Sequence, residues 1–178
     1  MKAVAEAGGD MTKVNGDSIF PVLNMLNTKY FIFPLQGGQT VPVQNPYAYG
    51  NAWFVDKVTY ANNANEEIDE VGKLNLRHEA VADAKFKEQL GQSVPQDDTS
   101  MVKMIQYKPN NLTYEVKSSK GGVIVFSEIY YPGWTATVDG QPAELGRVNY
   151  ILRALNVKPG SHKVVLDFHP SSLKKTET

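Results

Sequence analysis

The sequence predicts a mainly β protein: an antiparallel, jelly-roll-like β-sandwich with one or two short helices in its N-terminal half. Two observations lead to this prediction. In the last third of the chain, short runs of β-branched and aromatic residues follow one another closely, with turn-forming residues between them. Several of these runs also alternate apolar and polar residues, which is typical of antiparallel strands with one buried and one solvated face.

The composition restricts the class of protein. The chain has 178 residues, 42% of them hydrophobic, which suits a packed core and excludes a disordered chain. The formal net charge is -1 without a basic run, so we expect no nucleic-acid partner. Cysteine is absent, which excludes disulfides and thiolate chemistry.

The sequence carries no membrane or export signal that we can identify. No run approaches the roughly 20 apolar residues of a membrane-spanning helix, and the start lacks the basic and apolar blocks of a signal peptide. We expect the chain to be soluble as given, and its sequence also fits an excised piece of a larger membrane protein.

The first 100 residues predict helices and strands in mixed order. Residues 1–16 are small and polar and predict a flexible leader. A short helix is expected next, with Asp17 or Ser18 as its N-cap and apolar residues at helical spacing. The elements expected after it are strands at 29–34, within 35–50, at 52–61 and at 78–86, a helix within 62–74, and an exposed polar segment at 87–100.

The last third of the chain predicts six strands. Their ranges are 101–108, 111–118, 122–131, 134–138, 148–157 and 162–169. Leu112, Tyr114 and Val116 alternate with polar residues and are expected to face the core. Strand 122–131 is apolar on both faces, so we place it centrally.

These elements predict one folded domain over residues 17–170. We divide it into an α+β part at 17–100 and a β-rich part at 101–170. A polar tail at 171–178 follows.

Three aromatic residues gather around a turn in the stretch 129-IYYPGWTATVDGQPAEL-145. Pro132 removes a backbone donor and Gly133 permits an unusual backbone angle, so the chain turns here. One interpretation is that Trp134 fills the core beside the turn, since tryptophan is usually well buried. The other is that Tyr130, Tyr131 and Trp134 form a stacking platform for a sugar ring.

Glu128 is the acid embedded in the apolar central strand. A buried carboxylate needs a partner, and Arg147 or Arg153 on the neighbouring strand is expected to supply it. We interpret this pair either as a structural salt bridge or as part of a ligand site. Catalytic motifs such as a nucleophile elbow, a zinc-binding HExxH helix or a phosphate loop are absent from the sequence, so we predict no catalytic residue and no cofactor.

A metal site is not predicted either. Asp167 and His169 lie two residues apart and would share one strand face, as two ligands of a metal would. The sequence shows no evident third ligand beside them.

Several longer strings resemble one family. They are LNMLNTKYFIF, NPYAYGNAWFVDKV, and the block from YYPGWTATVDGQP to the end of LDFHP. Together they are similar to the carboxy-terminal extracytoplasmic portion of the bacterial YfhO-like membrane proteins. The matching residues are Leu26, Asn27, Lys29, Tyr30, Ile32, Asn45, Ala48, Ala52, Trp53, Val55, Tyr131 to Trp134, Asp139, Gly140, Pro142, Arg147, Asn149, Arg153, Ala154, Gly160, His162 and Pro170.

The resemblance implies a large multi-spanning protein similar to GT-C type glycosyltransferases, which use lipid-linked sugars. Their catalytic acids lie in loops of the membrane portion, which this sequence lacks. A final membrane helix usually follows in the family, whereas this sequence ends in the polar residues 170–178. The resemblance therefore implies an extracytoplasmic location, tethered to the cytoplasmic membrane, with the membrane portion of the parent protein as partner.

We predict that such a module is non-catalytic and positions a glycan or another cell-envelope polymer. Aromatic rings would stack on the sugar and polar side chains would contact its hydroxyl groups. The predicted platform consists of Tyr130, Tyr131, Trp134, Glu128, Arg147, Asn149 and Arg153, with Tyr47 and Tyr49 as further candidates. The alternative is a structural or protein-interaction domain without a small ligand; an independent hydrolase is a third hypothesis.

Overall fold

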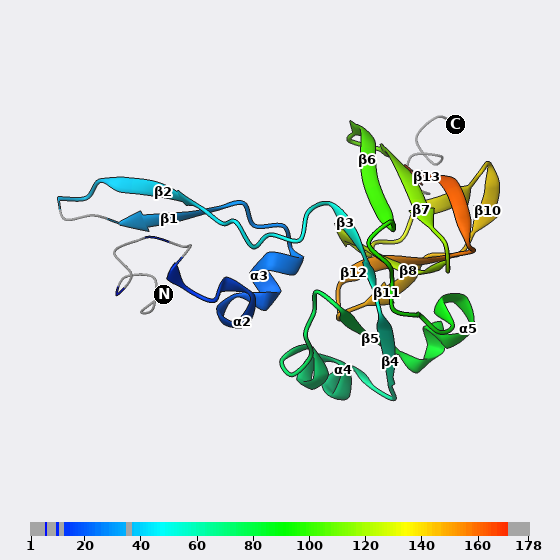
Figure 1. Ribbon diagram of the computed structural model, residues 1–178, viewed down its shortest axis with the longest axis horizontal. Coiled ribbons are helices and arrows are strands. Elements are labelled where there is room, and N and C mark those ends of the chain that lie inside the picture. The colour runs from blue at the N-terminus through cyan, green and yellow to red at the C-terminus, as the bar shows by residue number, and fades with distance from the viewer. Residues whose placement is uncertain (1–5, 7–9, 11–12, 35–36, 171–178) are drawn as a thin grey trace, which may run out of the picture. The chain divides into compact units, whose positions relative to one another are not determined.

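Figure 1 shows the computed structural model, which describes residues 6, 10, 13–34 and 37–170. The chain divides into two compact units, residues 1–50 and 51–178. The predicted polar tail lies outside the described residues, as does most of the predicted leader. None of the helices in the described ranges has both the length and the apolar character that crossing a membrane requires.

The first unit contains two short helices and a β-hairpin. The helices are α2 (Gly16–Ile19) and α3 (Pro21–Met25), and the hairpin strands are β1 (Tyr30–Pro34) and β2 (Thr40–Gln44). The single helix predicted here is divided at Phe20, and Pro21 begins the second helix, where its missing N–H leaves no hydrogen bond unmade. Val14, Phe20 and Phe31 form a small core under one face of the hairpin.

Two buried asparagines connect the helices of this unit to the end of β2. Asn45 donates from Nδ2 to Oδ1 of Asn24, at 2.9 Å, and to the carbonyl of Thr28, at 2.8 Å. Asn24 in turn donates to the carbonyl of Gly16 at 2.9 Å. These bonds satisfy buried amides that would otherwise destabilise the unit.

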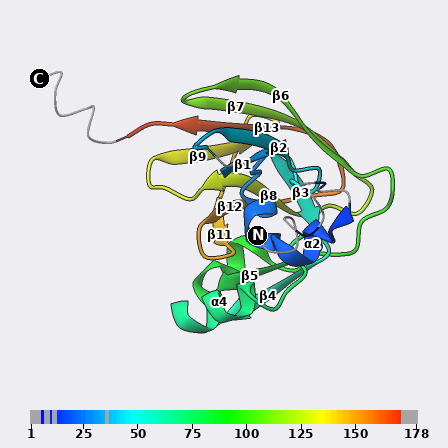
Figure 2. The same ribbon diagram turned by 90° about the vertical axis from the view of Figure 1, so that its left-hand side faces the viewer.

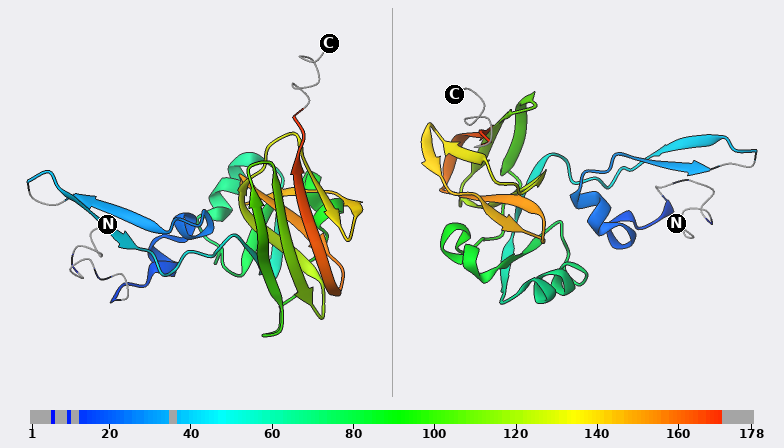
Figure 3. Two further views of the ribbon diagram at one scale, coloured as in Figure 1. Left: turned by 90° about the horizontal axis from the view of Figure 1, so that it is seen from above. Right: turned by 180° about the vertical axis from the view of Figure 1, so that it is seen from behind.

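The second unit is built on two antiparallel sheets that face each other (Figures 2 and 3). The five-stranded sheet has the order β10-β9-β13-β7-β6 and the four-stranded sheet the order β11-β12-β8-β3. The predicted antiparallel β-sandwich is confirmed. Its strands are β3 (Ala52–Val55), β6 (Met101–Lys108), β7 (Asn111–Ser118), β8 (Gly122–Ile129), β9 (Trp134–Val138), β10 (Gln141–Ala143), β11 (Gly146–Val148), β12 (Leu152–Val157) and β13 (Gly160–Phe168).

Both sheets contribute side chains to one core. Tyr114 on β7 and Phe126 on β8 are fully buried, with ring centres 5.0 Å apart in an edge-on arrangement. Leu112 and Val116 are buried on the same face of β7 as Tyr114, as the alternation predicts. Strand β8 lies between β12 and β3, so its predicted central position is confirmed.

The strand predicted at 52–61 is two strands. β3 joins the four-stranded sheet, whereas β4 (Lys57–Ala61) pairs in parallel with β5 (Glu79–Asp83), and α4 (Ala64–Val71) connects the two. The break falls at Asp56, whose N–H donates to the carbonyl of His78 and whose carboxylate contacts the His78 ring. The chain therefore leaves the sandwich here and forms a small β-α-β unit.

The strand predicted at 148–157 is also divided. Asn149 and Tyr150 adopt positive φ angles of 50° and 72° and form a turn between β11 and β12. Asn149 bonds to Val81 through both its backbone N–H, at 2.7 Å, and its side-chain oxygen, at 3.0 Å. Asparagine tolerates this backbone region better than most residues, and its side chain replaces a strand partner.

The segment predicted as an exposed excursion at 87–100 is partly packed. It follows a short 3-10 helix, η2 (Ala84–Phe86), and begins with a helical turn, α5 (Lys87–Leu90), whose Leu90 is fully buried. Ser93 then donates to the carbonyl of Val55 and Gln96 to the carbonyl of Gly121. The polar side chains of this segment thus bind it to the sandwich, which polarity alone does not predict.

Truncating the core at Leu166 should destabilise the fold strongly. Leu166 is fully buried on β13 and belongs to the core shared by the two sheets. We expect Leu166→Ala to lower the free energy of unfolding by about 2–5 kcal/mol, as measured by urea denaturation. Ile129→Ala, at an exposed position on β8, should change it by less than about 0.5 kcal/mol. Equal losses in the two variants would contradict the assignment of the core.

The pair of His162 and Asp139 should make stability depend on pH. His162 Nδ1 lies 2.7 Å from Asp139 Oδ2, and this bond raises the pKa of His162 and lowers that of Asp139. The contribution of His162 is therefore complete below its unfolded pKa of about 6.5 and is lost as the pH rises through the raised value. The stability difference between wild type and His162→Gln should be larger near pH 6 than near pH 9, measured by urea denaturation. A pH-independent difference would refute this linkage.

Candidate functional site

The aromatic corner between β8 and β9 borders an open hollow of ≈ 410 Å³. The turn Tyr131-Pro132-Gly133 forms one side of it. Gly133 has a φ of 100°, and a Cβ here would lie 3.1 Å from the ring of Phe168. The position therefore favours glycine for two reasons, its backbone angle and its close packing. The hollow is lined by Gln89, Tyr130, Tyr131, Pro132, Gly133, Trp134, Thr135, Ala136, Pro142, Ala143, Glu144 and Leu145.

The three predicted aromatic residues all line this hollow, but they differ in exposure. Tyr131 is 62% exposed, with its ring centre 6.3 Å from that of Phe168. Tyr130 is half-buried, edge-on to Phe86 at 5.6 Å. The two tyrosines thus contact different neighbours, and Tyr131 offers the more accessible ring.

Trp134 belongs partly to the core and partly to the hollow. It is half-buried, packs against the core shared by the two sheets, and lies 5.2 Å from Phe168 between ring centres. The guanidinium of Arg153 stands 3.9 Å from the centre of its ring. This arrangement combines a cation–π contact with the core packing predicted for Trp134, and it covers one face of the indole.

Arg153 and Glu128 form a salt bridge beneath the corner. Arg153 is 1% exposed, and its Nη2 lies 3.1 Å from Oε2 of Glu128. Burial lowers the pKa of Arg153, and the carboxylate of Glu128 opposes that shift. The predicted pairing of Glu128 is therefore made by Arg153 and not by Arg147. Neither member of the pair is among the residues that line the hollow.

Arg147 and Asn149 bind to the β-α-β unit and do not take part in the aromatic corner. Arg147 Nη2 lies 2.7 Å from Oε2 of Glu67, a fully buried acid on α4, and the N–H of Tyr150 donates to the other oxygen of that carboxylate. Asn149 bonds to Val81. The structure thus places both predicted site residues at the turn between β11 and β12, where they bind α4 and β5. The sequence analysis did not select Glu67, because it lies in an acidic run that is typical of a solvated helix face.

Tyr47 and Tyr49 are packed within the first unit. The hydroxyl of Tyr47 donates to the carbonyl of Val14 at 2.8 Å, and Tyr49 is buried. Tyr49 therefore offers no open stacking face, and the hydroxyl of the half-buried Tyr47 is engaged within the unit.

The hollow also contains residues that the sequence analysis did not select. Glu144 and Thr135 lie within residues 129–145, the same stretch as the aromatic residues, so their place in the sequence could have predicted them. Gln89 comes from α5, more than 40 positions before Tyr131. Only the packing of α5 beside β12 brings it to the corner, and no sequence pattern predicts it.

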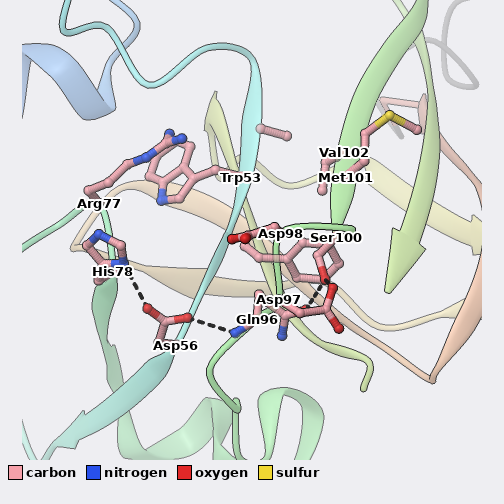
Figure 4. A pocket seen from close by; sticks show the side chains of 12 residues that line it. Trp53, Asp56, Arg77, His78, Gln96, Asp97, Asp98, Ser100, Met101 and Val102 are labelled. Carbon is pink, nitrogen blue, oxygen red and sulfur yellow. Dashed lines mark hydrogen bonds and ion pairs between the residues drawn. The ribbon is translucent and has the colours of Figure 1, made fainter. Parts of the chain in front are cut away.

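A second open hollow, of ≈ 420 Å³, lies where β3 ends (Figure 4). The carboxylate of Asp56 contacts His78 Nδ1 at 2.8 Å and accepts from the N–H of Gln96 at 3.1 Å. Asp97 accepts from the hydroxyls of Ser119 and Thr99, which hold the pKa of its carboxyl well below the usual range. These two acids are engaged in hydrogen bonds that fasten residues 93–100 to the sandwich.

A cluster of three or more histidine or acidic side chains suited to a metal ion does not occur among the described residues. The acids of both hollows bond to nitrogen and hydroxyl groups where their contacts are defined. The chemistry available at the aromatic corner is therefore stacking and hydrogen bonding.

The comparisons with known proteins give one match. A family model described as bacterial membrane protein YfhO matches residues 67–176, which is more than half of the chain. No curated protein and no solved structure shows a significant match. The matched range contains the whole aromatic corner, Gln89, and both arginine pairs.

Removing the charge of Glu128 should leave Arg153 buried without a full counter-charge. We expect Glu128→Gln to lower the free energy of unfolding by about 1–3 kcal/mol, measured by urea denaturation. Glu115→Gln, at an exposed site on β7, is the matched control and should change it by less than about 0.5 kcal/mol. In the double variant Glu128→Gln/Arg153→Met, the loss should be smaller than the sum of the single losses. Additive losses would show that the pair is not coupled.

Proposed function

Because the chain belongs to the family of the bacterial membrane protein YfhO, we propose that it is a non-catalytic extracytoplasmic β-sandwich of a membrane glycosyltransferase. In this proposal the aromatic corner holds a glycan, or another cell-envelope polymer, near the membrane-embedded portion of the same protein. That portion would carry out any transfer reaction.

The observation that carries the proposal is the composition of the corner hollow. Its volume of ≈ 410 Å³ lies within the range of small-molecule sites. Exposed and half-exposed rings from Tyr130, Tyr131 and Trp134 line it together with polar groups from Gln89 and Glu144. Flat apolar rings beside hydrogen-bonding groups match a sugar, which has an apolar C–H face and polar hydroxyl edges.

In this proposal the aromatic residues have different tasks. Tyr131 is the most exposed of the three, so it supplies the main stacking face. Trp134 has one face covered by Arg153 and lies against Phe168, so it supports the turn and presents its remaining surface to the hollow. The Gln89 amide, which lines the hollow, would donate hydrogen bonds to sugar hydroxyl groups, and the ionised Glu144 carboxylate would accept them.

The same hollow argues against glycoside hydrolysis at the aromatic corner. Glycoside hydrolysis uses two carboxyl groups separated by roughly 5–10 Å across the scissile bond. Glu144 is the one carboxylate among the described residues that line the hollow. Glu128, the other acid considered from the sequence, is engaged with Arg153. This supports a binding role without catalysis.

A structural or protein-interaction domain without a small ligand is the second candidate. The observation in its favour is that four of the seven predicted platform residues form ion pairs or hydrogen bonds within the fold and do not line the hollow. They are Glu128, Arg147, Asn149 and Arg153. In this alternative the corner would be a packed turn with one exposed tyrosine.

Glycan binding can be tested with one exposed ring. The wild-type chain would be screened on an array of bacterial cell-envelope glycans, and the dissociation constant of any hit measured by calorimetry. We expect Tyr131→Ala to weaken binding about tenfold, because it removes the main stacking face while the fold stays intact. Tyr107→Ala is the matched control: Tyr107 is similarly exposed, at 67%, but lies on β6 away from the lining of the hollow, so binding should be unchanged.

Two results would overturn the proposal. One is the absence of binding to any glycan on the array by a chain that is folded by circular dichroism. The other is equal affinity of wild type and Tyr131→Ala for a glycan that does bind. Either result would favour the structural alternative.

A further inference from the structure

The β1–β2 hairpin exposes an apolar face that its own unit does not cover. The register pairs Tyr30 with Gln44 and Ile32 with Pro42. Because side chains alternate along a strand, these four residues share one face, opposite to Phe31 and its cross-strand partner. On this face Tyr30 is 59% exposed and Ile32 69% exposed. Pro34 pairs with Thr40, so that pair lies on the same face. We refer to Tyr30, Ile32, Pro34, Thr40, Pro42 and Gln44 as the outer face of the hairpin.

Exposed apolar side chains are concentrated in the first unit. Of the fourteen large hydrophobic residues exposed in the described part of the chain, six lie before residue 51. They are Ile19, Val22, Leu23, Tyr30, Ile32 and Val41. Of these six, Tyr30 and Ile32 lie on the outer face of the hairpin. A two-stranded hairpin is marginally stable on its own in water, and exposed apolar residues that share one face indicate an interaction site.

The hairpin is also free of charge. The sequence contains no charged residue between Lys29 and Asp56, so neither strand carries the lysines or acids that usually protect an exposed edge. Lys29, which is exposed, immediately precedes β1. The outer face is therefore uncharged and mainly apolar, and the cation Lys29 lies next to the start of β1.

We infer that the outer face of the hairpin docks onto the surface of a lipid bilayer, with Ile32 in the acyl boundary and Tyr30 at the level of the headgroups. The distribution of charge is consistent with a bilayer. The uncharged outer face can enter the boundary between headgroups and acyl chains, and Lys29 can pair with an anionic headgroup. Tyrosine is favoured at this depth because its ring is apolar and its hydroxyl reaches water. The family to which the chain belongs is one of membrane proteins, so a bilayer is close to the parent protein.

The strand edges disfavour a protein strand as the occupant. Pro34 and Pro42 have no backbone N–H, and proline on an edge impedes the addition of another strand. The open edges also prevent full insertion, since unpaired backbone groups do not occur in the hydrocarbon region. A hairpin that rests on the interface by its outer face satisfies both conditions: the face contacts lipid and the strand edges remain hydrated.

The test uses the full chain and vesicles made of equal parts phosphatidylglycerol and phosphatidylcholine. In a flotation assay, wild type should float with the vesicles. We expect Ile32→Asp to reduce the bound fraction about five- to tenfold, because it places a charge in the docking face. Tyr30→Ser should reduce it in the same direction. Vesicles of phosphatidylcholine alone should bind less wild type, since Lys29 then has no anionic partner.

The matched control is Ile68→Asp. Ile68 is 47% exposed on α4, so the substitution has the same chemistry at an isolated apolar position, and flotation should equal that of wild type. Thermal unfolding of each variant verifies that the fold is retained. The inference is overturned if wild type does not float, if Ile32→Asp floats as wild type does, or if Ile68→Asp reduces flotation equally. Concentration-dependent dimers that Ile32→Asp dissociates, without vesicle binding, would assign the face to a second copy and would also overturn it.

Discussion

The contact of two antiparallel sheets over one hydrophobic core is the constraint on which the other features of the second unit depend. Tyr114 from one sheet meets Phe126 from the other, and aliphatic residues of β12 and β13 surround them. Since β8 is in one sheet and β9 is in the other, the chain between them must cross the edge of the core within a few residues. The turn Tyr131-Pro132-Gly133 makes that crossing, so the aromatic corner is a consequence of the two-layer architecture.

Two ion pairs, each with one buried member, lie at turns of the chain. Arg153 connects Glu128 on β8 with the ring of Trp134 on β9, across the corner. Arg147 connects Glu67 on α4 with the turn after β11. Buried ion pairs contribute little net stability compared with apolar packing, but loss of one partner is costly. Their effect here is to specify which segments meet, and thus to position the corner and the β-α-β unit.

The two proposals concern separate surfaces and separate chemistry. The corner of the second unit combines rings with an amide and a carboxylate, which suits a polyhydroxylated ligand. The outer face of the hairpin in the first unit carries no charged residue, which suits a lipid surface. Membership of a membrane-protein family is common to both. A module that contacts a bilayer and a glycan would hold that glycan close to the membrane, where lipid-linked sugars are located.

The sequence by itself determined the sandwich, the central place of the strand after Gly122 and the core face of β7, because alternation and turn residues are local signals. It also identified the aromatic residues of the corner. For the partner of Glu128 it left two candidates, Arg147 and Arg153, of which the structure selects Arg153. The tertiary structure decided the rest. Asp56 and Asn149 interrupt strands through bonds to His78 and Val81, and Gln89 reaches the corner through packing. These contacts join residues far apart in the chain, so only the folded arrangement of the sheets and α4 selects them.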